Sequence, residues 1–194
     1  MATPIHSSTC AGSGISPHSP YLFLFLEIFS REGGIQSYVK DIFYSYTALE
    51  RFPNADVFLL RDDRASASSN PFESEMLRFH YFKTHSPTWG RARLAISLLH
   101  YLLQHRPQRV FCGHINLAPL VALLCRPLHI PYTVLTYGKE VWHPLPRPAQ
   151  AALRHADQIW TISRYSRDQA CAANQLDLKK FHLLPCVVDT EKFT

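Results

Sequence analysis

Residues 21–51 decide the fold class, and they read YLFLFLEIFSREGGIQSYVKDIFYSYTALER. The first six, Tyr21–Leu26, form the unbroken apolar run that a strand buried on both faces requires. The polar turn that follows ends in Gly33-Gly34. Apolar residues then recur at helical spacing over 35–51, and a proline two residues later prevents the helix from continuing. The segment therefore predicts a buried strand, a glycine turn and a helix.

Strand and helix patterns alternate through the rest of the chain. Further strands are expected at 56–60, 76–82, 109–112, 132–136, 158–162 and 181–184. Further helices are expected at 89–105, 116–128, 149–155 and from the N-cap Ser163 to about residue 172, with a polar loop at 61–71 and a stiff connection at 144–148. This alternation predicts an α/β fold with a doubly wound, mainly parallel, Rossmann-like sheet whose ligands bind at the carboxyl ends of the strands.

Composition and length favour one globular domain. The chain has 194 residues, of which 46% are hydrophobic, and we expect a domain over 21–194 after a flexible leader at 1–20. The apolar run near residue 21 is too short to cross a membrane and has no basic segment before it. Five cysteines without a C-x-x-C pair argue against a disulfide framework or a zinc site and favour a reducing cytoplasm.

The formal net charge of +5 favours anionic partners. Lys and Arg are scattered singly among Asp and Glu, which argues against a nucleic-acid-binding stripe. Phosphorylated donors, lipid-linked acceptors and the surface of an anionic membrane fit this charge, although a solvated surface is the commonest role of such residues. We therefore expect a cytoplasmic protein that can contact the inner face of a membrane peripherally.

The glycine turn carries the first candidate site. Gly33 and Gly34 let the backbone approach a ligand, and the N–H groups at the start of the following helix favour phosphate or sugar oxygens. A tight turn without a ligand is an equally good interpretation from the residues alone. Neither a G-x-G-x-x-G nor a Walker pattern is present.

Three further polar turns follow strands and are expected on the same rim. They contain His114, the segment Tyr137-Gly138-Lys139-Glu140, and the pair Ser163-Arg164. Each has an ordinary structural explanation as well: a lone histidine is more often structural, a serine caps a helix, and a glutamate can be a surface charge.

Other chemistries find no support. There is no H-E-x-x-H motif for zinc hydrolysis and no Asp-x-Asp pair to hold a divalent ion on a diphosphate. Asp62-Asp63 is the nearest substitute, and we place it in a loop of surface character. A nicotinamide-dependent oxidoreductase is disfavoured because the dinucleotide glycine pattern is missing.

Five segments of the chain resemble family 4 glycosyltransferases, which have the two-domain GT-B fold. They are Phe29-Ser30-Arg31-Glu32-Gly33-Gly34-Ile35-Gln36, Gly113-His114-Ile115-Asn116-Leu117-Ala118-Pro119, Thr136-Tyr137-Gly138-Lys139-Glu140-Val141-Trp142, Ala156-Asp157-Gln158-Ile159-Trp160-Thr161-Ile162-Ser163 and Leu184-Pro185-Cys186-Val187-Val188-Asp189-Thr190-Glu191-Lys192-Phe193. They occur in order over about 21–193, and together they are more specific than any one alone.

The resemblance implies the N-terminal, acceptor-side lobe of a retaining enzyme that transfers a sugar from a nucleotide donor to a glycan, lipid or small-molecule acceptor. It implies no bound metal and no cofactor beyond the donor. By position, Gly33, Gly34, Ile35 and Gln36 would meet the donor diphosphate or the reacting sugar, and the turn at Tyr137-Gly138 would approach the transferred sugar. His114, Lys139, Glu140, Ser163 and Arg164 complete the predicted substrate-binding set, and no catalytic residue is assigned.

Two departures from the family limit this expectation. Many members have His-Gly where this chain has Tyr137-Gly138, and a phenol titrates too far from neutrality for a proton-transfer role. The family's Arg, Lys and E-x7-E donor-binding residues belong to a C-terminal domain, and the sequence ends at Thr194 before any of them. We therefore expect a split or truncated enzyme with little activity unless that domain is supplied, because nothing else would stabilise the leaving diphosphate. A catalytically silent binding module with the same fold is the alternative.

Overall fold

The computed structural model describes residues 21–49, 53–68 and 70–187, so the predicted leader lies outside the described residues. In this part of the chain, parallel strands form one seven-stranded sheet in the order β3-β2-β1-β4-β5-β6-β7. The strands are β1 (Tyr21–Phe25), β2 (Ala55–Leu59), β3 (Leu77–Tyr81), β4 (Arg109–Cys112), β5 (Tyr132–Thr136), β6 (Gln158–Thr161) and β7 (Phe181–Leu183). The predicted doubly wound parallel sheet is confirmed.

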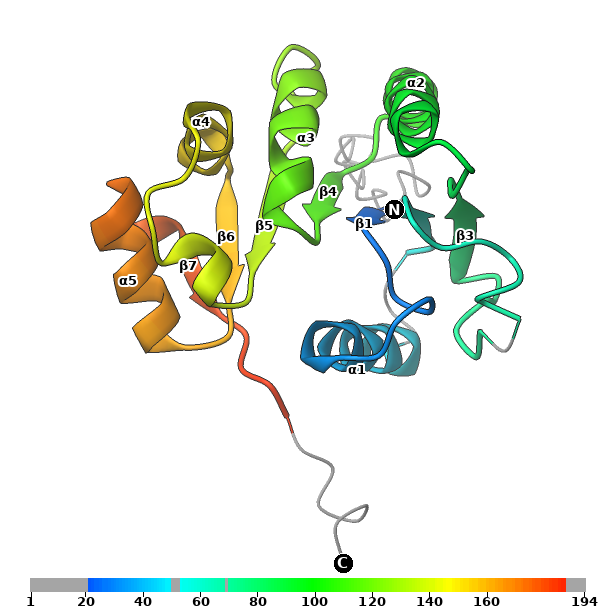
Figure 1. Ribbon diagram of the computed structural model, residues 1–194, viewed down its shortest axis with the longest axis horizontal. Helices are drawn as coiled ribbons and strands as arrows, with labels where there is room; N and C mark the ends of the chain where they lie inside the picture. Colours follow the sequence, from blue (N-terminus) through cyan, green and yellow to red (C-terminus); the bar gives the residue numbers. More distant parts are fainter. Residues whose placement is uncertain (1–20, 50–52, 69, 188–194) are drawn as a thin grey trace, which may run out of the picture.

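Helices cover both faces of the sheet. They are α1 (Gly34–Ala48), α2 (Pro87–His105), α3 (Ala118–Cys125), α4 (Arg147–His155) and α5 (Arg164–Asn174), with short 3-10 helices η1 (Ile115–Leu117), η2 (Lys139–Val141) and η3 (Leu178–Lys180). Figure 1 shows α2, α3 and α4 above one face, α1 beneath the other, and α5 at the β6–β7 end. No helix in the described part of the chain is both long and apolar enough to cross a bilayer.

The central strand β1 explains why its sequence is apolar without alternation. Leu22 and Leu24 are fully buried in the core under α2, α3 and α4. Phe23 and Phe25 point to the opposite core, which α1 covers. Burial of each such side chain contributes about 1.5–3 kcal/mol, so a polar residue at any of these positions would weaken one layer or the other.

Two expected elements differ from the structure. The helix expected at 116–128 begins as the 3-10 helix η1, and α3 already ends at Cys125. The stiff connection expected at 144–148 is wrong in its second half, because α4 starts at Arg147 and includes Pro148 in its first turn. Proline is tolerated there because the first N–H groups of a helix have no intrahelical acceptor.

Candidate functional site

The candidate site lies where the strand order reverses direction. From β1, the chain first builds β2 and β3 on one side and then β4 to β7 on the other. The loops after β1 and β4 therefore leave the same edge of the sheet at neighbouring strands, and ligands of such sheets bind at this point. The glycine turn follows β1, and His114 follows β4.

The start of α1 is open. Gly33 is its N-cap with extended backbone, and no side chain caps the helix. A β-carbon on Gly33 would lie 2.9 Å from Oε1 of Gln36, whereas one on Gly34 would have nothing within 4 Å. Neither glycine has the left-handed conformation. Neither the backbone conformation nor the packing therefore requires a glycine at position 34. Its lack of a side chain leaves the first N–H groups of α1 accessible.

A buried carboxylate from the loop after β2 holds the loop between β1 and α1. Asp62 Oδ2 accepts the backbone N–H groups of Ile28 at 2.6 Å and Phe29 at 3.1 Å, and its Oδ1 accepts that of Ser30 at 2.8 Å. Asp62 has no exposed surface, so the expectation that Asp62-Asp63 is of surface character is wrong for Asp62. Burying a carboxylate is costly unless it is hydrogen-bonded, and these three N–H groups meet that requirement.

Gly113 allows β1 and β4 to approach each other closely at their ends. A β-carbon there would lie 1.9 Å from Cδ1 of Phe25, which leaves no room for any side chain. Its N–H donates to the carbonyl of Leu24 at 2.7 Å. The glycine is therefore required by packing, and it brings His114 next to the loop that follows β1.

His114 presents a neutral imidazole. Its Nδ1 accepts the N–H of Asn116 at 3.1 Å, which leaves the proton on Nε2. Burial lowers the pKa of His114; the charge of Glu140 opposes this, that of Arg61 adds to it, and that of Glu27 opposes it. At neutral pH the residue is thus a hydrogen-bond donor through Nε2–H and carries no charge.

The side chain of Tyr137 is buried beneath the turns that follow β4 and β5. Its hydroxyl donates to the carbonyl of Gly113 at 2.8 Å, and its ring packs edge-on against Tyr38. Burial raises the pKa of Tyr137 well above its usual value. The carboxylate of Glu140 accepts the backbone N–H groups of Tyr137 and Gly138. The phenol is therefore turned away from the rim, and the backbone of the turn lies there instead.

The fourth predicted turn, Ser163-Arg164, follows β6 and adjoins the turn after β5. Ser163 Oγ accepts the N–H of Ser166 at 3.1 Å and caps α5, as the sequence predicts. A β-carbon on Gly138 would lie 3.8 Å from Oγ of Ser166, so this turn adjoins the one after β5. Arg164 and Lys139 are exposed beside these turns.

Three adjoining hollows mark the rim near β1. The smallest, of about 170 Å³, brings together the predicted residues Ile35, Gln36 and His114. Arg61 lines this hollow and two more, of about 420 and 470 Å³. None of the three is lined by the remaining predicted residues, which are Gly33, Gly34, Tyr137, Gly138, Lys139, Glu140, Ser163 and Arg164.

Sequence reasoning missed several residues of this crevice, which we define as the three hollows that share Arg61. Besides Arg61, they include Glu27, Arg91 and Asn116. A signal was present, because Glu27 and Arg61 follow the first two strands within two residues. The strand-end criterion that selected His114 selects them as well.

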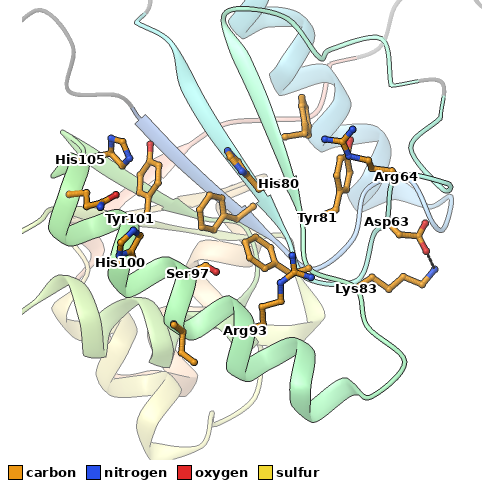
Figure 2. Close-up of a pocket in the computed structure, with 15 residues that line it drawn as sticks. Asp63, Arg64, His80, Tyr81, Lys83, Arg93, Ser97, His100, Tyr101 and His105 are labelled. Atoms are coloured by element: carbon orange, nitrogen blue, oxygen red, sulfur yellow. Dashed lines mark ion pairs between the residues drawn. The ribbon is translucent and has the colours of Figure 1, made fainter.

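A larger groove of about 760 Å³ lies between β3 and α2, and two of its lining residues, His80 and Tyr101, are hydrogen-bonded to Asp56 behind it. The nearly buried Asp56 accepts hydrogen bonds from Arg78, His80 and Tyr101 at 2.7–2.9 Å. Burial would raise the pKa of Asp56, but these hydrogen bonds and the charge of Arg78 outweigh it and lower the pKa. Figure 2 shows His80 and Tyr101 facing the groove, with the ion pair of Lys83 and Asp63 at its end. We interpret this cluster as a brace between β2, β3 and α2.

The described residues contain no group of three or more His, Cys, Asp or Glu side chains arranged to hold a metal ion. The four cysteines among them, Cys112, Cys125, Cys171 and Cys186, are free. Burial raises the pKa of Cys112 to about 12, so this thiol next to the crevice is protonated and is not a nucleophile at neutral pH.

Comparison with known proteins identifies the fold. No family model matches the sequence, and no curated protein sequence matches it. Among solved structures, the lipopolysaccharide outer core galactosyltransferase WaaB is similar with a TM-score of 0.62 and 13% identity, over 87% of this chain and 46% of that one. HepE from Anabaena in complex with UDP-glucose gives 0.63 and 13%, over 90% and 45%. UDP-GlcNAc 2-epimerase from Methanocaldococcus jannaschii gives 0.54 and 10%, over 84% and 44%.

The chain spans about half the length of these structures. At such low identity the likeness shows the fold alone, a Rossmann-like α/β domain of the kind found in GT-B enzymes.

Proposed function

We propose that this chain is the acceptor-side domain of a retaining glycosyltransferase of family 4, which transfers a sugar from a nucleotide donor to a glycan, lipid or small-molecule acceptor. The observation that carries the proposal is the uncapped start of α1, whose residues Ile35 and Gln36 share a hollow with neutral His114 at the β1–β4 switch point. The structural neighbours whose names include a galactosyltransferase and a complex with UDP-glucose support it.

Groups of the crevice, and of the nearby turns at the start of α1 and at 137–140, have roles that suit this chemistry. The N–H groups at the start of α1 would receive phosphate oxygens of the donor, where the helix dipole adds a favourable field without a metal ion. The Nε2–H of His114 would donate to a hydroxyl of the sugar or to a phosphate oxygen. The backbone of the turn at 137–140, held by Glu140, would border the sugar from the far side. We propose that a second lobe supplies the remaining contacts to the leaving diphosphate.

We also propose that the protein is cytoplasmic and reaches a membrane through α2. This helix exposes Trp89, Ile96, Leu99 and Leu103, and it contains no acidic residue. Positions 89, 96 and 103 repeat at seven-residue intervals, so they lie along one side of the helix. Apolar side chains with nearby arginines suit the interface of an anionic membrane.

Co-sedimentation with vesicles tests the membrane contact. The chain should bind vesicles that contain phosphatidylglycerol and not those of phosphatidylcholine alone. The double variant Ile96→Asn/Leu103→Asn should lose binding, and Leu178→Asn, which changes an exposed leucine at η3, should retain it. Equal binding of both variants would refute this part of the proposal.

Titration with nucleotide sugars tests the main proposal. We would titrate the chain with UDP-glucose and GDP-mannose by NMR, alone and with a donor-binding lobe of a GT-B enzyme supplied in trans. Gly34→Leu should abolish the response of the α1 amides while leaving the unfolding free energy near the wild-type value, because nothing lies within 4 Å of a β-carbon there. Gly34→Ala should have an intermediate effect.

Two outcomes would count against the transferase. A nucleotide sugar that perturbs Gly34→Leu as it perturbs the wild type would place the ligand elsewhere. If no nucleotide sugar binds even when the second lobe is supplied, the silent binding module becomes the better interpretation.

A further inference from the structure

The 420 Å³ hollow of the crevice is unusually cationic. It lies at the carboxyl ends of β1, β2 and β3, beside the start of α2. Its charged lining consists of the cations Arg31, Arg61, Lys83 and Arg91 and one carboxylate, Glu27. It adjoins the 170 Å³ hollow at α1, because Glu27 and Arg61 line both.

Nearby acids leave much of this charge uncompensated. Arg61 is 3.7 Å from Glu27, a loose contact, while Lys83 has its own partner outside the hollow in Asp63 at 2.8 Å. Arg31 and Arg91 are exposed and have no ion pair within the described residues. A compact basic hollow of this kind attracts and holds anions.

Acidic residues occur on one side of the hollow only: Glu32 follows Arg31 and Asp62 follows Arg61, whereas the segment from β3 to β5 adds no negative charge. Not one Asp or Glu occurs from residue 76 to residue 139, which covers β3, α2, β4, α3 and β5. The start of α2 also contributes to the lining through Pro87 and Gly90. A β-carbon on Gly90 would lie 3.2 Å from the carbonyl oxygen of Phe82, so the absence of a side chain lets this helix start pack against the end of β3.

We propose that the acceptor carries a phosphate group and that Arg31, Arg61 and Arg91 hold it in this hollow; the acceptor role rests on the proposed function. Guanidinium groups match phosphate oxygens through paired N–H donors, and a charge-assisted contact is stronger than a neutral one. Because the two hollows share Arg61, a phosphate held here places the rest of the acceptor toward the sugar at the start of α1. The phosphate can belong to a soluble sugar phosphate or to a lipid headgroup.

NMR titration of the 194-residue chain tests the proposal. The probes are glucose 6-phosphate, glucose, and dihexanoyl phosphatidic acid below its micelle concentration. We compare the wild type with Arg61→Gln/Arg91→Gln and with Arg147→Gln. Arg147 is a control matched to Arg91, since both are exposed, lie in the first turns of a helix and have no ion pair within the described residues.

We expect the phosphorylated probes to shift the side-chain Nε signals of Arg61 and Arg91 saturably, and glucose not to. Affinity should fall at least about tenfold in the double variant, because that factor corresponds to losing a single charge-assisted hydrogen bond and the variant removes two guanidinium groups; it should not change in Arg147→Gln. Tighter binding of glucose 6-phosphate would indicate a soluble acceptor, and tighter binding of the lipid a headgroup. Both results support the proposal.

Equal affinity in the wild type and the double variant would overturn the proposal, as would equal binding of glucose. The proposed function fails separately, through the nucleotide-sugar response of Gly34→Leu. If the phosphate site is present and that response is absent, the hollow binds phosphate but its assignment to an acceptor is wrong.

Discussion

Asp62→Asn tests whether one buried carboxylate positions the glycine turn. The amide can keep its oxygen toward Ile28 and Phe29, the two N–H groups on Oδ2, and then loses the bond to Ser30. Hydrogen bonds to charged groups contribute about 1.5–3 kcal/mol and neutral ones about 0.5–1.5 kcal/mol. Weakening two bonds and losing a third, whose N–H can turn to water because Ser30 is exposed, should reduce the unfolding free energy by about 2–4 kcal/mol.

Urea unfolding and amide hydrogen exchange provide the measurements. Exchange at Ile28 and Phe29 should accelerate more than exchange within β1. The control is Asp63→Asn, which changes the adjacent, half-exposed carboxylate paired with Lys83 and should cost less. Equal destabilisation by the two variants, with unchanged exchange in the loop, would refute the role assigned to Asp62.

Three further predictions follow from contacts near the crevice and the groove. Gly113→Ala should destabilise the fold by about 1–3 kcal/mol through overpacking, whereas Gly34→Ala, whose β-carbon meets nothing, should not; equal urea midpoints would contradict the packing argument. Tyr101→Phe removes a donor to Asp56, whose folded-state pKa is lowered, so its cost should be present above about pH 4 and shrink as the pH falls below that value; a pH-independent cost in urea unfolding would be inconsistent with this. Burial lowers the pKa of His114, so the residue should titrate below pH 6.5 in NMR. Its contribution to the unfolding free energy should be complete above that pH and should be lost as the pH falls toward the folded-state pKa; a pKa above 6.5 would refute the neutral imidazole.

The fold was predictable because burial acts on patterns that are local in sequence. The run at 21–26 is buried on both faces beyond Tyr21, so it is continuously apolar, and that continuity is visible without knowing which elements pack against the strand. Helix boundaries at 116–128 were less accurate. An apolar stretch there does not show where 3-10 geometry gives way to α-helix, nor that the side chain of His114 caps η1.

The positions of the turns at the candidate site were predictable, and the directions of their side chains were not. Gly33, Gly34 and His114 lie where the strand-end rule places them, because a parallel sheet fixes which edge its loops share. The direction of Tyr137 was not predictable, since its hydroxyl bonds to Gly113, which is 24 residues distant. For the same reason Asp62 looked like a surface residue. Its partners are 32–34 residues earlier, and no local pattern marks a carboxylate that binds distant N–H groups.

The buried Asp62 holds the chain that enters the uncapped start of α1. A helix start that is left uncapped for a ligand loses the contact that would otherwise fix the chain entering it. Here the residue that follows β2 fixes that chain, four to six residues ahead of Gly34. Asp62 holds the loop through residues 28–30 and not through the helix start, so the first N–H groups of α1, where we propose that the ligand binds, stay uncapped. Asp62→Asn should therefore weaken ligand binding at Gly34 without touching the ligand, because a mobile turn must be ordered before its N–H groups can bind.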